Sequence, residues 1–394
     1  MARLEEICSL ITDGSHFSPE DEGVGYPMFS VKDMTPNGFN ISGCKKIGEE
    51  AYKKLVANGC KPLNDDVVVA KDGSYLKTAF VIKGNPEITL LSSIAILRPK
   101  IDLVVPEYLS YFLKSDAVYR TVSLNYITGT ALKRIILKGI RKIEVDLPDI
   151  GEQEQRAQRL SKVDYLCQLR KQQLAKLDEL VKARFVEMFG DPINNPMKWI
   201  VSKIEDIAAQ EKNALKAGPF GSALKKEFYV RSGYKIYGQE QVICGDASFG
   251  DYYIDEEKYK ELKNCAVQAG DILISLVGTY GKTLIMPDNY EAGIINPRLM
   301  KITLNKNKVT PIYFKYYFES NALKASMDAN THGGTMGILN LGIIRQMKIQ
   351  VPPLSLQNQF AAFVERVDQQ KQTVQQSLEK LELLKKALMQ EYFG

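Results

Sequence analysis

The most regular pattern of hydrophobic and polar residues in this chain occurs twice, over residues 152–189 and 356–393. Both stretches lack proline and glycine and are rich in residues that favour a helix. At 1.5 Å per residue, each helix would be about 55 Å long. Apolar residues recur at heptad spacing, which predicts that the two helices pair as a coiled coil. We expect the pairing seam to contain Val163, Leu174, Leu177, Leu180, Val367, Leu378, Leu381 and Leu384.

The two helical stretches are copies of each other. Shifting residues 147–190 by 204 positions places them on residues 351–394 without a gap. Chance would give roughly one match in fifteen positions. Arg170 and Arg184 replace apolar seam residues in the first copy. The first-copy residues that recur are Pro148, Gln153, Gln155, Ala157, Val163, Asp164, Leu174, Leu177, Leu180, Ala183, Glu187, Phe189 and Gly190.

The segments ahead of the helices read as mixed α and β, and they match each other only loosely. Short runs rich in β-branched and aliphatic residues at 66–70 and 271–275, bounded by turn residues, predict strands. A proline followed by an aromatic-rich stretch predicts helices at 106–113 and 311–318, whose tyrosines suit core packing better than base stacking. We therefore divide the chain into globular domains at 1–146 and 191–350, and long helices at 147–190 and 351–394.

Composition excludes several classes of protein. The 394 residues are 45 per cent hydrophobic and 25 per cent charged, as in ordinary globular proteins. No apolar run approaches the roughly 20 residues needed to span a bilayer. The N-terminal residues carry acids where a signal peptide would be apolar, so we expect a cytoplasmic protein without a membrane partner. Six scattered cysteines and two histidines favour neither a disulfide framework nor a metal site.

One segment of the first domain is strongly basic. Residues 117–143 contain no acid, although the net charge of the whole chain is only +5. Such a stretch suits binding to phosphates, but a solvated surface explains it almost as well. The matching region of the second domain is only mildly basic. The basic residues of this stretch are Arg120, Lys133, Arg134, Lys138, Arg141 and Lys142.

A turn motif recurs in both domains after the predicted strands. Residues 73–78 read Gly-Ser-Tyr-Leu-Lys-Thr and residues 278–283 read Gly-Thr-Tyr-Gly-Lys-Thr. The second copy imitates the end of a phosphate-binding loop, but Leu276 occupies the position where that loop requires its first glycine. A turn that presents backbone N–H groups, a hydroxyl and a lysine to nucleic acid fits both copies, and a plain hairpin turn remains the alternative.

Residues for catalysis are missing from the pattern. A DNA methyltransferase needs a glycine-rich cofactor loop and an Asn-Pro-Pro-aromatic or Pro-Cys site, and residues 296–298 (Asn-Pro-Arg) do not qualify. No Ser/His/Asp set or paired acidic motif occurs in both domains. We therefore expect no catalytic site and no bound metal in this chain.

Over essentially its whole length, the chain resembles the specificity subunit of type I restriction-modification systems. The resemblance rests on the ordered occurrence of short strings together with the duplicated helices. The strings are residues 11–19 (Ile-Thr-Asp-Gly-Ser-His-Phe-Ser-Pro), 31–34 (Val-Lys-Asp-Met), 218–222 (Gly-Pro-Phe-Gly-Ser), the two lysine turns, and 351–354 (Val-Pro-Pro-Leu) with Gln357. The first domain lacks the Gly-Pro-Phe-Gly-Ser string.

The resemblance implies an α+β protein in which two target-recognition domains are joined by an antiparallel coiled coil. Each domain would read half of a split, double-stranded DNA site, and the helices would set the spacer and dock two modification subunits. Adenine methylation and ATP-driven cleavage would belong to partners, so S-adenosylmethionine, ATP and Mg are expected on those subunits and not on this chain. We expect DNA contacts from Ser15, His16, Lys32, Ser74, Tyr75, Lys77, Lys133, Arg134, Ser222, Gln239, Thr279, Tyr280, Lys282 and His332.

Three alternatives stay open at this point. The chain could serve a methylation-only system that lacks the restriction (nuclease) subunits. It could be a nucleotidyl or methyl transferase that uses residues 278–283, which cofactor binding by the isolated chain would reveal. It could also be a coiled-coil adaptor for other proteins, and salt-dependent DNA binding would argue against that role.

Overall fold

The computed structural model describes residues 1–73, 75–128, 133–220, 223–330 and 339–394. The chain divides into two compact units, unit 1 with Met1–Lys171 and Gln375–Gly394, and unit 2 with Gln172–Val374. Each unit mixes helix and sheet, as the patterns predict. The helices α6 (Ile150–Phe189) and α13 (Leu354–Phe393) each contribute to both units.

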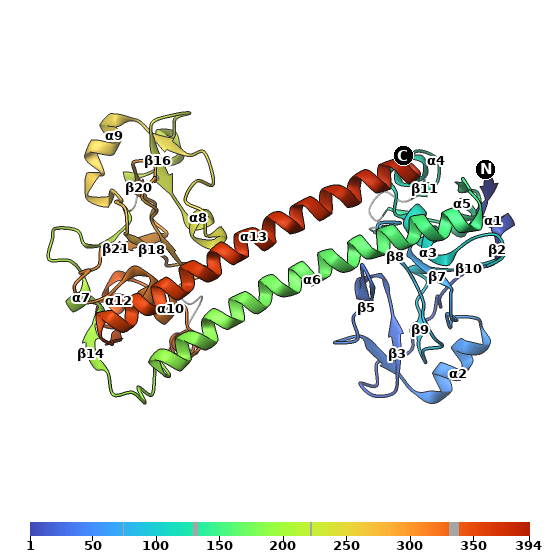
Figure 1. Ribbon diagram of the computed structural model, residues 1–394, viewed down its shortest axis with the longest axis horizontal. Helices are drawn as coiled ribbons and strands as arrows, with labels where there is room; N and C mark the ends of the chain where they lie inside the picture. Colours follow the sequence, from blue (N-terminus) through green and yellow to red (C-terminus); the bar gives the residue numbers. More distant parts are fainter. Residues whose placement is uncertain (74, 129–132, 221–222, 331–338) are drawn as a thin grey trace. The chain divides into compact units, whose positions relative to one another are not determined.

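A four-stranded antiparallel sheet forms the centre of unit 1 (Figure 1). Its order is β2-β10-β7-β8, and β7 is buried throughout because its run of valines faces side chains on both sides of the sheet. A second sheet, in the order β6-β3-β9, pairs β3 with β9 in parallel. The strands are β2 (Cys8–Asp13), β3 (Tyr26–Phe29), β6 (Lys45–Ile47), β7 (Val67–Ala70), β8 (Ala79–Val81), β9 (Thr89–Leu90) and β10 (Ile94–Pro99).

Shorter elements complete unit 1. The two-residue strands pair as β1 with β13, β4 with β5, and β11 with β12. Helix α3 covers the main sheet with a face of Tyr, Leu and Phe residues and begins at Pro106, as predicted. These elements are β1 (Ala2–Arg3), α1 (Leu4–Ile7), β4 (Met34–Thr35), β5 (Gly38–Phe39), α2 (Glu49–Ala57), α3 (Pro106–Leu113), α4 (Asp116–Asn125), β11 (Ile127–Thr128), β12 (Arg134–Ile135), α5 (Leu137–Arg141) and β13 (Glu144–Val145).

Unit 2 repeats this topology. Its main sheet has the order β15-β21-β18-β19, its second sheet the order β17-β16-β20, and β14 pairs with β22. The strands are β14 (Ile200–Lys203), β15 (Leu215–Ala217), β16 (Tyr234–Tyr237), β17 (Tyr253–Ile254), β18 (Ile272–Ser275), β19 (Thr283–Ile285), β20 (Gly293–Ile295), β21 (Leu299–Ile302) and β22 (Lys348–Val351). The helices are α7 (Ile204–Ile207), α8 (Gln239–Cys244), α9 (Glu256–Glu261), α10 (Pro311–Phe318), α11 (Asn321–Asn330) and α12 (Leu341–Gln346).

The second sheets of the two units also share an aromatic pair. Tyr26 stacks on Tyr52 with ring centroids 3.9 Å apart, and Tyr234 stacks on Tyr259 at 3.8 Å. In each unit the pair joins a strand to the helix that flanks the sheet. The globular segments are therefore duplicates whose shared fold survives large differences in sequence.

Within each unit, α6 and α13 lie side by side and run antiparallel. In unit 1, Asp164 Oδ1 lies 2.5 Å from Lys385 Nζ, and Lys171 Nζ lies 3.0 Å from Glu382 Oε1. In unit 2, Asp178 Oδ1 lies 2.7 Å from Lys371 Nζ. Residue numbers rise along α6 as they fall along α13, which defines the antiparallel direction.

The buried stripe of these helices differs in part from the predicted seam. Val163, Val367 and Leu378 are buried, and Leu174, Leu177 and Leu381 are half-buried. Leu180 and Leu384 do not lie in the seam, because 49 and 47 per cent of their surface is exposed. Successive residues of a helix point about 100° apart. The buried face of α6 passes instead through the neighbouring Val181 and through Phe185.

Two repeated glutamines attach each globular unit to the start of its long helix. Gln153 Oε1 accepts the Val105 N–H at 2.9 Å, and Gln153 Nε2 donates to the carbonyls of Leu103 and Pro148 at 3.2 and 2.9 Å. Gln357 makes the same three hydrogen bonds in unit 2, with Thr310, Lys308 and Pro352 at 2.8, 3.0 and 2.8 Å. The repeated identity of this residue therefore has a structural cause.

Candidate nucleic-acid interface

The loops at one end of the main sheet bring most of the predicted contact residues of unit 1 together. Strands β2 and β7 end there, and β10 begins there. The Ser92 N–H donates to the Ser15 carbonyl at 2.9 Å, and the Gly73 N–H donates to the Lys133 carbonyl at 2.9 Å. The backbones of Asp72 and Arg134 pair in an isolated antiparallel β-bridge. Segments that are far apart in sequence thus form one surface.

A buried ion pair lies beneath this surface. Lys71 Nζ pairs with Asp13 Oδ2, and only 9 and 12 per cent of the two side chains are exposed. The His16 imidazole lies 3.6 Å from the other Asp13 oxygen and is 80 per cent exposed. Asp13 neutralises Lys71, and Asp72 Oδ1 lies 3.8 Å from Arg134 Nε. The side chains of Lys133 and Arg134 are nevertheless exposed on this surface.

Unit 2 builds the same end of its sheet with the same backbone hydrogen bonds. The Leu276 N–H donates to the Arg298 carbonyl at 2.9 Å, as the Lys71 N–H donates to the Ser93 carbonyl at 2.9 Å. The Gly218 N–H donates to the Leu299 carbonyl at 2.9 Å, and in unit 1 the Gly14 N–H donates to the Ile94 carbonyl at 3.2 Å. The two loop clusters therefore share one backbone framework.

Two glycines of the sequence strings are required by this framework. A Cβ atom on Gly14 would lie 2.1 Å from the Leu90 carbonyl oxygen, and one on Gly218 would lie 1.9 Å from the Asn296 carbonyl oxygen. Backbone atoms cannot move aside easily in a packed sheet end. The absence of a side chain at these glycines lets the loops after β2 and β15 lie against the backbone of a neighbouring segment of the same unit.

The repeated lysine turns follow β7 and β18, as predicted. Leu76 and Gly281 occupy the same left-handed position, with φ of 59° and 74°. Lys77 and Lys282 are exposed, and Lys77 Nζ lies 5.3 Å from the Tyr119 ring centroid. The two turns therefore present their lysines to solvent.

Tyr75 does not point outward. It is only 3 per cent exposed, stacks on Tyr119 at 5.2 Å and shares a 3.1 Å hydrogen bond with Ser123. Tyr280, at the equivalent position in unit 2, is half-buried against the core. The predicted DNA contact of Tyr75 is therefore replaced by a core position, because its ring fills space beside α4.

The aspartates that precede these turns have structural roles. Asp66 is fully buried and accepts from Arg98 Nε at 2.8 Å, and Asp271 is fully buried and accepts from Lys301 Nζ at 2.9 Å. Each cation comes from the neighbouring strand. Such pairing offsets the cost of burying a carboxylate.

The remaining predicted residues have varied positions. Ser15 is buried, and its Oγ is hydrogen-bonded to Phe17. Lys32 and Thr279 are exposed, and Gln239 is half-buried at the start of α8. Ser74, Ser222 and His332 lie outside the described residues.

Sequence reasoning missed Arg298 and the Asp13–Lys71 pair. Arg298 is exposed, and its Nη1 donates to Gln239 Oε1 at 3.5 Å. Its sequence context was weighed only as a methyltransferase motif. The equivalence of Arg298 and Ser93 would have identified Arg298 as a candidate. That equivalence becomes visible only from the strand pairing of both units.

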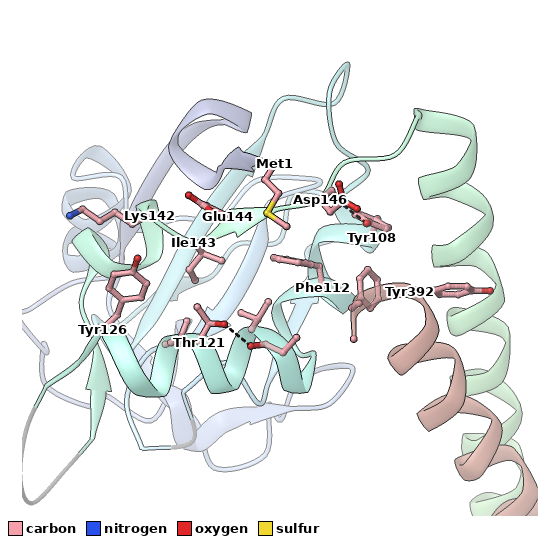
Figure 2. Close-up of a pocket in the computed structure, with 15 residues that line it drawn as sticks. Met1, Tyr108, Phe112, Thr121, Tyr126, Lys142, Ile143, Glu144, Asp146 and Tyr392 are labelled. Carbon is pink, nitrogen blue, oxygen red and sulfur yellow. Dashed lines mark hydrogen bonds between the residues drawn. The ribbon is translucent and has the colours of Figure 1, made fainter.

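The pocket of unit 1 drawn in Figure 2 is lined by none of the predicted contact residues. It has a volume of about 450 Å³ and lies between α3, α4 and the end of α13, where Phe112, Thr121 and Tyr392 line it. Among the described residues, no group of His, Cys, Asp and Glu side chains could hold a metal ion. No helix in the described part of the chain has the length and apolarity to cross a bilayer.

Comparison with known proteins now defines the family. The model of the type I restriction modification DNA specificity domain matches residues 1–179 and again 196–383. The putative type I restriction enzyme MjaX specificity subunit of Methanocaldococcus jannaschii is 23 per cent identical over 396 residues, covering 98 per cent of this chain and 90 per cent of the relative.

Solved structures share the fold. The type I restriction-modification S subunit from M. genitalium matches with a TM-score of 0.56 at 15 per cent identity, over 100 per cent of this chain and 95 per cent of that one. A chain from a study of complex assembly and conformational transition of the type I R-M system matches with a TM-score of 0.58 at 17 per cent identity, over 100 and 96 per cent. The chain belongs to the type I restriction-modification specificity subunits, which recognise DNA, and it carries the specificity domain twice.

Proposed function

We propose that each unit reads one half of a split, asymmetric DNA target. One observation carries this proposal. The same backbone framework holds different side chains at equivalent loop positions, with Asp13, Lys71 and Ser93 in unit 1 matched by Ala217, Leu276 and Arg298 in unit 2. A shared framework with different chemistry is what two readers of different base sequences require.

Features that recur in both units suit the phosphate backbone, which has the same chemistry at every base pair. Lys77 and Lys282 meet this criterion, because both are exposed at the same turn. Phosphate contacts fix the register of a protein on DNA but carry no direct sequence information. The residues that differ between the units are therefore the candidates for base contacts.

Exchange of one recognition domain tests this proposal. Residues 1–146 would be replaced by the equivalent domain of a relative with a different target, and the methylated motif would be mapped by modified-base sequencing after reconstitution with the modification subunit. We expect one half of the motif to change and the other to remain. Exchange of residues 191–350 is the matched control and should change the opposite half. A change in both halves after either exchange would contradict independent reading.

We further propose that the chain lacks catalytic activity and that two modification subunits supply methylation. S-adenosylmethionine would bind to these subunits, and ATP and Mg would bind to restriction subunits where the system has them. Purified chain incubated with DNA and labelled S-adenosylmethionine should transfer no methyl groups until the modification subunit is added. Transfer by the chain alone would refute this part of the proposal.

The paired helices would set the spacer between the half-sites and dock the modification subunits. Antiparallel contacts between α6 and α13 occur in both units, and a packed pair resists bending where a flexible linker would not. Inserting four residues near Gln172 adds roughly 6 Å of helix, close to two base-pair steps. We expect unchanged half-sites with a spacer longer by one or two base pairs. A spacer of the original length would show that the helices do not measure it.

A further inference from the structure

Equivalent positions in the two loop clusters identify where the recognition chemistry of unit 2 differs most from that of unit 1. Arg298 and Ser93 both precede the central strand of the main sheet, and both accept a backbone hydrogen bond at 2.9 Å from the residue that follows the neighbouring strand. In unit 1 this position has a small hydroxyl, whose Oγ accepts the Val31 N–H at 3.0 Å. In unit 2 it has a guanidinium group that reaches solvent.

Several contacts hold the arginine in place. The Arg298 N–H donates to Asn296 Oδ1 at 2.9 Å, which orders the backbone. Arg298 Nη1 donates to Gln239 Oε1 at 3.5 Å, and Gln239 Nε2 in turn donates to the Val277 carbonyl. The amide of Gln239 thus has both of its polar atoms engaged inside the protein. It orients the arginine and is not itself free to read a base.

The guanidinium group keeps most of its hydrogen-bonding capacity. A guanidinium has five N–H donors. Within the described residues, no carboxylate lies within ion-pair distance of Arg298, in contrast to Lys71 and Lys301 at neighbouring positions of the two sheets. An exposed arginine that contacts Gln239 and has no carboxylate partner in the described part of the chain is suited to an external acceptor with two adjacent lone pairs.

Two DNA groups offer such acceptors: a phosphate, and the O6 and N7 edge of guanine in the major groove. The comparison of units favours guanine. A contact to phosphate would serve both units equally, and the repeated lysines are suited to that role. Arg298 differs from its counterpart Ser93, as a residue that selects one base among four should.

Resting on the proposed function, we propose that Arg298 reads a guanine in the half-site contacted by unit 2. Gln239 is a positioning residue that acts through Arg298. The half-site of unit 1, with serine at the same place, has no arginine-read guanine at the corresponding base pair.

Arg298→Ala and Arg298→Lys variants, assembled with the modification subunit, test this inference. Methylated motifs would be mapped by modified-base sequencing, and binding would be measured on duplexes with single-base changes. We expect discrimination at one guanine of one half-site to fall by about 5- to 150-fold, the range for one good bidentate pair. Arg298→Lys should lose part of this discrimination, because an ammonium lacks the planar fork of a guanidinium, while it keeps its charge and the salt dependence of binding.

Two further variants complete the test. Gln239→Ala should relax the same base pair by a smaller factor, with unchanged thermal stability, because the arginine loses its orientation and not its charge. Lys306→Ala removes an exposed cation beside Gly270, where β18 begins, and should change neither motif nor discrimination.

Different outcomes overturn different claims. An unchanged motif with folded Arg298→Ala overturns the inference. So does a loss of affinity that is uniform across sequences with a salt slope lower by about one, which marks a phosphate contact. If the wild-type complex itself methylates no defined split motif, the proposed function fails, and that result is distinct from failure at a single base pair.

Discussion

Replacement of Gln357 by alanine should destabilise unit 2 strongly. The Gln357 side chain is fully buried and makes three hydrogen bonds, from the Thr310 N–H at 2.8 Å and to the carbonyls of Lys308 and Pro352 at 3.0 and 2.8 Å. Alanine would leave these backbone groups without partners, at a cost of about 1–3 kcal/mol each, and would open a cavity. Water can reach some of these three backbone groups better than others and replace part of the lost hydrogen bonding. We therefore expect the free energy of unfolding of unit 2 to fall by about 3–5 kcal/mol in total.

The single tryptophan of the chain provides the assay. Trp199 lies in unit 2, where its Nε1 donates to the Phe189 carbonyl at 2.9 Å. Urea unfolding followed by tryptophan fluorescence therefore reports on unit 2. A loss of this size should lower the midpoint by about 1 M urea or more. Gln153→Ala is the matched control, because it breaks the same three bonds in unit 1 and should shift the transition seen by circular dichroism more than the one seen by fluorescence.

A glutamate at the same position refines the test. Gln357→Glu keeps the acceptor for the Thr310 N–H but places an oxygen against two carbonyls, so we expect a loss at pH 7 at least as large as for alanine. Burial would raise the pKa of the introduced carboxyl, and the folded state would then bind more protons than the unfolded state. Stability should therefore recover as the pH falls. An alanine variant within about 1 kcal/mol of wild type would refute the reasoning.

Four other predictions follow from the structure. Gly281→Ala should lower the free energy of unfolding of unit 2 by about 1–2 kcal/mol, measured by tryptophan fluorescence, because a residue with a side chain is strained at φ of 74° even where space is available. Lys282→Ala should weaken DNA binding across all sequences and lower its salt slope by about one. Lys71→Met should destabilise unit 1 by about 3–5 kcal/mol, because the buried Asp13 carboxylate loses its ammonium partner. Asp13→Leu in the same chain should restore most of this loss in urea unfolding. Burial lowers the pKa of Lys114 to about 8, below its value near 10.4 in the unfolded chain, so the unfolded state binds more protons between these values. The stability of wild-type unit 1 should thus rise between pH 8 and 10, a gain that Lys114→Met should lack in unfolding measured at each pH.

Patterns that depend on neighbours in sequence were predicted well. The long helices extend over 150–189 and 354–393, and the helices that begin at Pro106 and Pro311 have the predicted bounds. Strands 67–70 and 272–275 lie inside the predicted runs. Each of these elements is specified by a helical period, by a proline at its start or by a run of β-branched residues, and each of these signals depends only on residues that are close in sequence.

Side-chain direction was predicted less well. Tyr75 was expected to contact DNA because the turn around it repeats, yet its ring packs against Tyr119 of α4. Leu180 fits the heptad pattern, yet the face of α6 passes through Val181, because the packing partners change along the helix. A rotation of one residue cannot be read from spacing alone.

The sequence by itself determined that the chain is a duplication, that a long helix follows each of two divergent domains, and which family it belongs to, because repeats and periodicities are properties of the order of residues. Only the tertiary structure decided which loops share a surface. The Asp13–Lys71 pair joins residues 58 positions apart, and Gln239 meets Arg298 across 59 positions. Such contacts arise from strand pairing, which brings distant segments to one end of a sheet. No local pattern encodes that geometry.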